Sequence, residues 1–174
     1  MRTIEKNQTG TTLIEVMVSV LVLAIGLLGI AGLQANALKY QKTSSYRSEA
    51  SQIAYDLSDR LRANSAGFAN YIYSKTYAQA AADIPAPESS LPCALAVNCN
   101  PALIADFDKR DLRRNLNARL AGGALNIVQD MNTTTRALNV TLMWKEPGFS
   151  VADGSCPNGI APAGVRCFTL RVSL

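Results

Sequence analysis

A long uncharged segment near the N-terminus constrains this chain more than any other feature of its sequence. No charged side chain occurs between Glu15 and Lys39, and residues 16–33 are apolar except for Ser19 and three glycines. A helix needs roughly 20 apolar residues to cross the ~30 Å hydrocarbon core of a bilayer. Residues 11–33 meet this length, so the sequence predicts a membrane-spanning helix that is retained in the mature protein.

A cleaved secretory signal peptide is the alternative interpretation of this segment. Signal peptides have shorter apolar regions and end in small residues at the cleavage site. Ala31 and Gly32 resemble such a site, but the helical pattern continues beyond them. The length therefore favours a retained span.

The helical pattern continues into the polar part of the chain. Apolar side chains recur there at the steps of three and four that are typical of an amphipathic helix: Tyr46, Ala50, Ile53, Ala54, Leu57 and Leu61. Asp56 and Arg60 have the i,i+4 spacing of an ion pair on the outer face. Residues 64–67 predict the helix end, so one helix is expected from Thr11 to Ala63, about 75–80 Å long at ~1.5 Å per residue.

A loop, a second helix and three strands are expected in the remainder. Residues 65–100 contain tyrosines at 71, 73 and 77 and are interpreted as an irregular surface loop. Asn100 and Pro101 have the pattern of a helix start, and Gly122 and Gly123 that of a helix end.

Alternating apolar and polar residues predict the three strands. The first has Leu125, Ile127 and Met131 on one side; in the second, Leu138, Val140, Leu142 and Trp144 alternate with Asn139, Thr141, Met143 and Lys145; in the third, Phe168, Leu170, Val172 and Leu174 alternate with Cys167, Thr169, Arg171 and Ser173. Such alternation is typical of antiparallel strands with one buried and one solvated face. The predicted fold class is α+β: a long N-terminal α-helix, half transmembrane and half amphipathic, packed on a small antiparallel β-sheet with a second helix.

The four cysteines indicate an oxidising compartment. They are Cys93, Cys99, Cys156 and Cys167, and none has the C-x-x-C spacing of a zinc knuckle or redox site. An even number suggests two disulfides. Four cysteines allow three connectivities, of which the nearest-neighbour pairs Cys93–Cys99 and Cys156–Cys167 are the preferred interpretation.

The composition argues against catalysis and nucleic-acid binding. The chain has no histidine, which excludes histidine-based catalytic dyads and the commonest neutral zinc ligand. No metal-ligand spacing or phosphate-binding glycine loop is present, so no enzyme activity, cofactor or metal is predicted. The basic cluster Arg110, Arg113 and Arg114 alternates with Asp106, Asp108 and Asp111. It is interpreted as a mixed-charge, solvated helix face, and no nucleic-acid partner is expected.

The short motif before the apolar segment is the most specific functional signal. Residues 10–15 read Gly-Thr-Thr-Leu-Ile-Glu and follow a leader with Arg2 and Lys6; this resembles the type IV prepilin signature. In that family a membrane peptidase cuts after the glycine and methylates the new N-terminal amine. The resemblance implies cleavage between Gly10 and Thr11 and methylation of Thr11, which stands where the family usually has phenylalanine.

Glu15 has a physical and a family interpretation. A carboxylate in an apolar helix is costly, and such residues are usually paired and functional. Glu15 also follows the proposed new terminus by about one turn, where the helix dipole favours negative charge. The resemblance implies that Glu15 neutralises the N-terminal amine of a neighbouring subunit during assembly. The alternative is a carboxylate stabilised only by water and the dipole.

The resemblance also implies a division of the chain and a location. Residues 1–10 would be the cleaved leader, 11–38 the transmembrane and filament-core half of the long helix, and 39–174 a periplasmic head. Basic residues flank both ends of the span, so the positive-inside rule gives no orientation. The cysteines and the resemblance favour a single-pass inner-membrane protein with an external head, later part of the pilus (fimbrium) at the cell surface.

Within the pilins, four segments resemble the PilV-like minor pilins: residues 53–64, 111–112, 120–123 and 140–144. Asn115 stands near a tryptophan that is common in the second helix of that subfamily. The resemblance implies a minor pilin that primes assembly of a type IV pilus used in twitching motility, at or near the tip. Its implied partners are other minor pilins, the major pilin, the prepilin peptidase, the inner-membrane assembly platform and a tip adhesin.

Three other functions are compatible with the same features. A minor pseudopilin of a type II secretion system shares the leader, span and head. A DNA-uptake (competence) pilin would need a cationic groove with aromatic residues. A membrane-anchored adhesin would use the tyrosine-rich loop.

Overall fold

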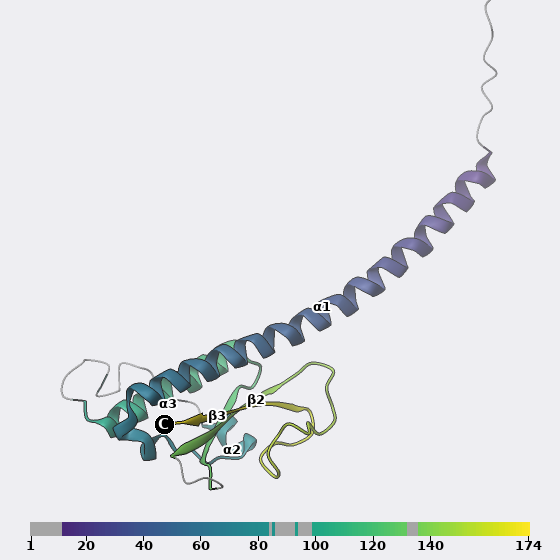
Figure 1. The fold of residues 1–174 in the computed structure, drawn as a ribbon. Helices are drawn as coiled ribbons and strands as arrows, with labels where there is room; N and C mark the ends of the chain where they lie inside the picture. Colours follow the sequence, from purple (N-terminus) through teal and green to yellow (C-terminus); the bar gives the residue numbers. More distant parts are fainter. Residues whose placement is uncertain (1–11, 84, 86–92, 94–98, 132–135) are drawn as a thin grey trace, which may run out of the picture. The chain divides into compact units, whose positions relative to one another are not determined.

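The computed structural model describes residues 12–83, 85, 93, 99–131 and 136–174. The elements follow the order α1 (Leu13–Ala63), η1 (Ser65–Tyr71, a 3₁₀-helix), α2 (Tyr77–Ala82), α3 (Pro101–Arg119), β1 (Ala124–Gln129), β2 (Ala137–Lys145) and β3 (Val165–Ser173), as Figure 1 shows. The chain divides into two compact units, one ending at Lys42 and the other running from Thr43 to Leu174.

The described part of the first unit is the apolar portion of α1. All of its residues from Thr12 to Lys42 are exposed. By its length and composition the helix is apolar enough to cross a membrane, and its most apolar stretch is fully exposed. It begins at Leu13, two residues later than predicted, because the Thr12 carbonyl accepts the first helical hydrogen bonds from the amides of Glu15 and Val16. The predicted end at Ala63 is confirmed.

In the second unit, the amphipathic part of α1 contributes to the main hydrophobic core. Its predicted stripe is buried from Tyr46 to Leu61. The stripe belongs to one cluster with residues of α3 and all three strands, including Leu112, Leu116, Leu120, Leu125, Ile127, Leu138, Val140, Leu142, Trp144 and Val172. The predicted α+β arrangement, with a long N-terminal helix packed on a small sheet, is confirmed.

The sheet is an antiparallel meander in the order β1-β2-β3. Leu142 in β2 pairs with Leu125 in β1 and Phe168 in β3. Side chains at directly opposite positions share a face of the sheet, so these three form one row that faces the main core. Leu125 and Leu142 are fully buried, and Phe168 is half-buried against that core.

The expectation of a solvated second face is wrong for β2. Thr141 and Met143 are 1% and 0% exposed, although both alternate away from the main core. Met143 belongs to a second cluster with Tyr77, Ala80, Ala124, Val165 and Cys167. The sheet is therefore covered on this face too, by α2 and by the loop before β3.

The segment predicted as an irregular surface loop contains two helices. η1 follows α1 almost directly, and α2 begins with a capping box in which the Thr76 and Gln79 side chains bond each other's backbone amides. Tyr71 and Tyr77 are buried because both elements pack inward. Residues 84, 86–92 and 94–98 of this segment lie outside the described part.

The ends of β1, β3 and α3 also differ from the predicted ends. Met131 lies beyond β1 and is 86% exposed, and Leu174 lies beyond β3 and is 40% exposed. The helix α3 begins as predicted, with the Asn100 side chain capping the Leu103 amide and Pro101 in the first turn. It ends at Arg119, before the predicted glycines, and Gly122 adopts a φ of 62° in the following turn.

Candidate functional site

The predicted processing site and the described helix adjoin each other. Gly10 and Thr11, the proposed cleavage and methylation residues, lie outside the described part of the chain. Glu15 lies in the first turn of α1 and is exposed. Its amide donates to the Thr12 carbonyl at 3.0 Å, and the Ser19 hydroxyl donates to the Glu15 carbonyl at 2.8 Å. The carboxylate therefore lies at the N-terminal end of the helix dipole.

The helix that follows Glu15 exposes large apolar side chains on all sides. Between Leu13 and Leu38 they include Ile14, Val16, Met17, Val20, Leu21, Leu23, Ile25, Leu28 and Leu33, each more than half exposed. A helix that is apolar all round is stable only inside a large core, in lipid or against other helices. This surface is suited to a bilayer and to helix–helix packing.

A partly buried polar network joins the end of α1 to α3. The Arg60 guanidinium forms ion pairs with Asp56 at 3.0 Å, Asp108 at 3.2 Å and Asp111 at 2.8 Å. Burial alone would lower the pKa of Arg60, but the hydrogen bonds with Asp56 and Asp111 outweigh it and raise the pKa above its usual value. The predicted Asp56–Arg60 pair is thus part of a larger cluster between two helices.

Tyr71 extends this network into η1. Its side chain is fully buried, and its hydroxyl donates to Asp108 at 2.5 Å. The Asn64 amide group donates to the Tyr71 hydroxyl at 3.3 Å and to the Pro101 carbonyl at 2.8 Å. Burial and the hydrogen bond to Asp108 raise the pKa of Tyr71. These contacts position the start of α3 against the end of α1.

Arg113 is a second charged residue that sequence reasoning placed at the solvated surface. It is 8% exposed, and Asp108 is 8% exposed. Arg113 forms an ion pair with Asp83 at 2.7 Å and lies 4.8 Å from the Tyr73 ring centroid. Tyr73 donates to Asp83 at 2.6 Å, and burial together with this bond raises the pKa of Tyr73 to about 12. The expectation of a solvated mixed-charge face is therefore wrong for Asp108 and Arg113.

The sequence offered little signal for these contacts. Tyr71 and Asp108 are separated by 37 positions, and Arg60 and Asp108 by 48. Apolar spacing identified the core positions of α1, but it contains no information about which buried polar groups will meet. The burial of the tyrosines also means that Tyr71 and Tyr77 do not form an exposed aromatic loop of the kind that an adhesin would use.

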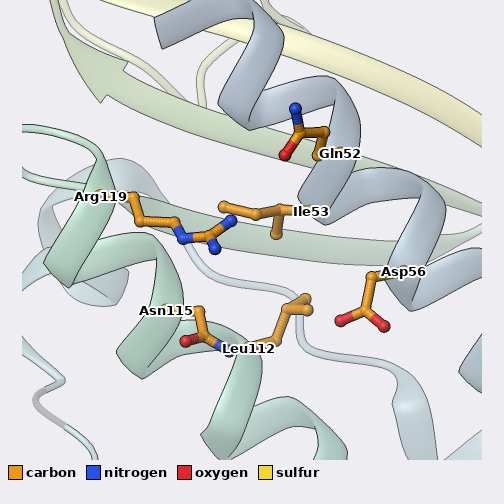
Figure 2. A pocket seen from close by; sticks show the side chains of 6 residues that line it. All are labelled: Gln52, Ile53, Asp56, Leu112, Asn115 and Arg119. Atoms are coloured by element: carbon orange, nitrogen blue, oxygen red, sulfur yellow. The ribbon is translucent and has the colours of Figure 1, made fainter.

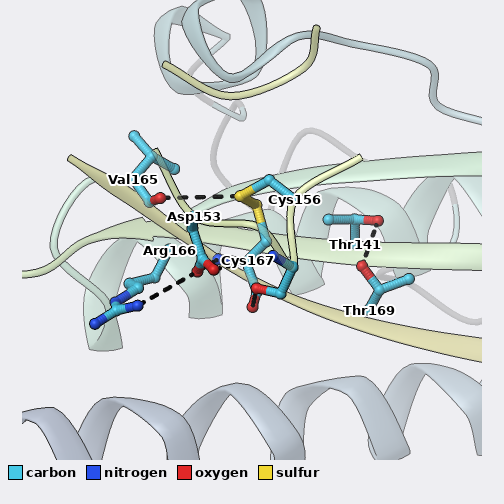
Figure 3. Close-up of a disulfide and its surroundings, with 8 residues drawn as sticks. Thr141, Asp153, Cys156, Val165, Arg166, Cys167 and Thr169 are labelled. Atoms are coloured by element: carbon cyan, nitrogen blue, oxygen red, sulfur yellow. Dashed lines mark hydrogen bonds and ion pairs between the residues drawn. A yellow bond between two sulfur atoms is a disulfide. The ribbon is translucent and has the colours of Figure 1, made fainter. Parts of the chain in front are cut away.

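The disulfide Cys156–Cys167 fastens the loop before β3 to the strand itself, as Figure 3 shows. The Cys167 amide donates to the Asp153 carboxylate at 3.2 Å, and the Ser155 hydroxyl donates to the Cys167 carbonyl at 3.1 Å. The second bridge joins Cys93 to Cys99. Both are nearest-neighbour pairs, and no free cysteine is found among the described residues.

The described part of the second unit contains several side-chain-lined hollows, two of which are the following. One, of about 280 Å³, lies between α1 and α3; Figure 2 shows its lining of Gln52, Ile53, Asp56, Leu112, Asn115 and Arg119. The other, of about 450 Å³, is lined by Arg47, Trp144, Asp153, Ser155, Arg166, Cys167 and Phe168. Within the described residues, no group of histidine, cysteine, aspartate and glutamate side chains could hold a metal ion.

Comparison with known proteins gives two adjoining matches. The family model of the prokaryotic N-terminal methylation motif matches residues 6–31, and that of type IV pilin Tt1218 matches residues 32–110. The comparisons with curated proteins and with solved structures gave no match. By these two matches, the exposed apolar helix and the α+β fold, the chain is similar to type IV pilins that carry a prepilin-type N-terminal methylation motif.

Proposed function

We propose that the chain is a minor pilin that primes type IV pilus assembly and is incorporated at or near the pilus tip. The observation that carries this proposal is the match to the methylation motif at residues 6–31, which includes the start of the exposed apolar part of α1. A pilin is a structural subunit, not an enzyme, so the proposed mechanism consists of processing, membrane storage and packing.

Processing is the first step of the proposed mechanism. The prepilin peptidase cuts between Gly10 and Thr11 and methylates the Thr11 amine. Residues 1–10 are then lost, residues 11–38 anchor the subunit in the inner membrane, and residues 39–174 form the head in the periplasm. The two disulfides support this orientation, because such bonds persist in an oxidising compartment.

Assembly is the second step. The apolar part of α1 leaves the bilayer and packs against the corresponding helices of other minor pilins and the major pilin. Glu15, in the first turn, neutralises the N-terminal amine of a neighbouring subunit, since a carboxylate in apolar surroundings needs a positive partner. The position of Glu15 at the start of an all-apolar helix supports this role.

The minor-pilin assignment rests on the head. The four segments that resemble the PilV-like minor pilins include the end of α1, the exit of α3 and the centre of β2. The proposed partners are the other minor pilins, the assembly platform and a tip adhesin, and the proposed consequence is support of twitching motility.

The first experiment determines the N-terminus of the membrane-bound protein by mass spectrometry, after expression with and without a prepilin peptidase. The expected product begins at methylated Thr11, depends on the peptidase and is lost in Gly10→Val. An intact Met1 would contradict the processing step. A new terminus near Ala31 would instead show a cleaved signal peptide and remove any assembly role of Glu15.

A second experiment tests the minor role and the place in the filament. Deleting the gene should reduce the number of surface pili, and an epitope-tagged chain should be detected at filament ends by immunogold electron microscopy. Glu15→Ala should abolish incorporation, whereas Glu49→Ala, on the same helix, should not. Labelling along the whole shaft would contradict the tip position, and normal piliation with lost protein secretion would favour a pseudopilin.

A further inference from the structure

The charges of α1 have a single sign for several turns beyond its apolar part. No acidic residue occurs between Glu15 and Glu49, whereas Lys39, Lys42 and Arg47 are basic. All three basic residues lie in the unbroken helix α1, and acidic and basic residues mix only in its later turns. The apolar part therefore adjoins a purely cationic segment at its C-terminal end.

Helix geometry gives the depth of the two lysines relative to a bilayer. The apolar run ends at Leu33, and because a helix rises about 1.5 Å per residue, Lys39 and Lys42 lie about 9 and 14 Å past it. The headgroup layer extends about 5–8 Å beyond each side of the hydrocarbon core. Side chains of a helix lean toward its N-terminus, which is the membrane end here, and a lysine extends its ammonium group toward the interface. Both ammonium groups therefore reach the headgroup layer when the apolar run fills the core.

Lys39 and its neighbour Tyr40 are available to lipid. Both are exposed, Tyr40 at 77%, and neither forms a hydrogen bond, an ion pair or a ring contact with another described residue. Tyrosine is enriched at the headgroup level because its ring is apolar and its hydroxyl polar. Lys42 is also exposed and adds a positive charge on the same side of the helix as Lys39, at the spacing i,i+3.

We propose that Lys39, Tyr40 and Lys42 bind the headgroups of anionic phospholipids in the periplasmic leaflet, at the Lys39 end of the span. A headgroup with a net negative charge attracts both lysines, whereas a zwitterionic headgroup carries its own cation, which cancels most of the attraction. The proposal rests on the membrane-stored state in the proposed function. Loss of the leader, residues 1–10, would make these lysines the main cationic side chains beside the span.

Native mass spectrometry of the full-length protein measures the lipid preference. The protein is released from mixed micelles that contain equal amounts of phosphatidylglycerol, which is anionic, and phosphatidylcholine, which is zwitterionic, with the same acyl chains. The ratio of the two lipids that remain bound is then determined. Phosphatidylglycerol should be retained in excess. Lys39→Gln should lower this ratio about fivefold, the factor expected for one lysine near an anionic surface.

Two variants are matched controls. Lys39→Arg keeps the charge and should keep the preference. Arg62→Gln removes one charge from the same helix, at a side chain that is 61% exposed, but roughly 40 Å past Leu33, and should leave the ratio unchanged. Neither position belongs to a core cluster, so all variants should keep the circular dichroism of the wild type. Equal retention of the two lipids by the wild type, or equal effects of Lys39→Gln and Arg62→Gln, would overturn the proposal.

Membrane fractionation separates failure of this proposal from failure of the proposed function. A full-length chain that resists extraction from membranes by carbonate but shows no lipid preference would overturn the lipid contact and leave membrane storage intact. A chain that carbonate extracts would contradict membrane storage itself, and the lipid contact with it. Lys39→Gln that blocks incorporation into pili while the lipid ratio is unchanged would assign Lys39 to a protein contact and overturn the proposal.

Discussion

At the scale of single residues, buried polar groups hold the end of α1 against η1 and α3 within the head. Asp108 accepts from Tyr71 and pairs with Arg60, so one carboxylate links η1, α1 and α3. A buried carboxylate is tolerated only when it is paired and hydrogen-bonded. These contacts therefore contribute to a specific arrangement of helices as well as to stability.

Removing one hydroxyl group tests this network. Tyr71→Phe keeps the ring in the core but leaves Asp108 short of one buried donor, which should lower the free energy of unfolding by about 1–3 kcal/mol. Urea unfolding followed by Trp144 fluorescence should show a lower midpoint with an unchanged slope. Tyr55→Phe, at a side chain that is 59% exposed, is the control and should have no effect. Equal midpoints for the two variants would show that the bond to Asp108 does not stabilise the fold.

The acid response of Asp153 is a second residue-scale prediction. Burial opposes its ionisation, but hydrogen bonds from the Ser155 and Cys167 backbone outweigh burial and hold the pKa of Asp153 below its usual range. A carboxyl group with a lowered folded pKa stabilises the fold above the unfolded pKa of about 4, and this stabilisation is lost as the pH falls through the folded pKa.

Amide hydrogen exchange at Cys167 measures this response. Protection of the Cys167 amide, which donates to Asp153, should decrease as the pH is lowered from neutral to below about 4. In Asp153→Asn the protection should be lower at neutral pH and should change little over the same range. Identical pH profiles in the two proteins would contradict the assignment to Asp153.

At the scale of elements, the packing of α1 against α3 is incomplete at one point. Asn115 is half-buried beside the hollow of about 280 Å³, whose lining includes the buried aliphatic side chains of Ile53 and Leu112 (Figure 2). An amide at this position covers less apolar surface than a large aromatic ring would.

Filling the hollow should stabilise the helix pair. Asn115→Trp is expected to raise the free energy of unfolding by about 0.5–2 kcal/mol, in the range of other cavity-filling changes. Thermal unfolding followed by circular dichroism is the measurement, and Asn117→Trp, at an exposed position on the same helix, is the control. A decrease in stability specific to position 115 would show that the hollow cannot accept the ring.

The disulfide-fastened loop is the second element-scale feature. Cys167 belongs to the second hydrophobic cluster, which lies on the face of the sheet opposite the main core. Met143 and Tyr77 belong to the same cluster. Replacing Cys156 and Cys167 together by serine should lower the free energy of unfolding by about 2–4 kcal/mol. Without the bridge, the unfolded chain can adopt a larger number of conformations, so its entropy is higher. Urea midpoints with and without reductant are the measurement: the wild type should lose stability on reduction, whereas any loss in the double variant must come from the other bridge.

At the scale of the whole molecule, the apolar unit and the head require different surroundings. Both core clusters consist of residues from Tyr46 onwards, and the described residues before Thr43 are exposed. The head therefore contains its own core, whereas the N-terminal part of α1 requires lipid or other helices.

Truncation tests this division. A chain of residues 43–174 should be soluble without detergent and should keep the near-ultraviolet circular dichroism of the full protein, which itself should fractionate with membranes. A chain that begins at residue 58 should not fold, because it lacks Tyr46, Ala50, Ile53, Ala54 and Leu57 of the core. Aggregation of the 43–174 chain would show that the head depends on the first unit.

The features that could be predicted from the sequence are those that depend on residues close together in the chain. The end of α1 at Ala63, the start of α3 at Pro101 and the core-facing side of β2 arise from patterns that repeat within a few residues. The methylation motif is equally local, and the family match at residues 6–31 covers it. Short-range patterns of this kind are present in full in the sequence.

The sequence by itself thus determined a long apolar helix, an amphipathic continuation, an antiparallel sheet and the prepilin-type motif. Only the tertiary structure decided that α2 and the disulfide loop cover Met143, that Asp108 and Arg113 are buried, and that Arg47, Trp144 and Arg166 line one hollow. The physical reason is that each of these features depends on partners far apart in the chain. Their pairing is selected by packing of the whole head, and periodicity within one segment carries no record of it.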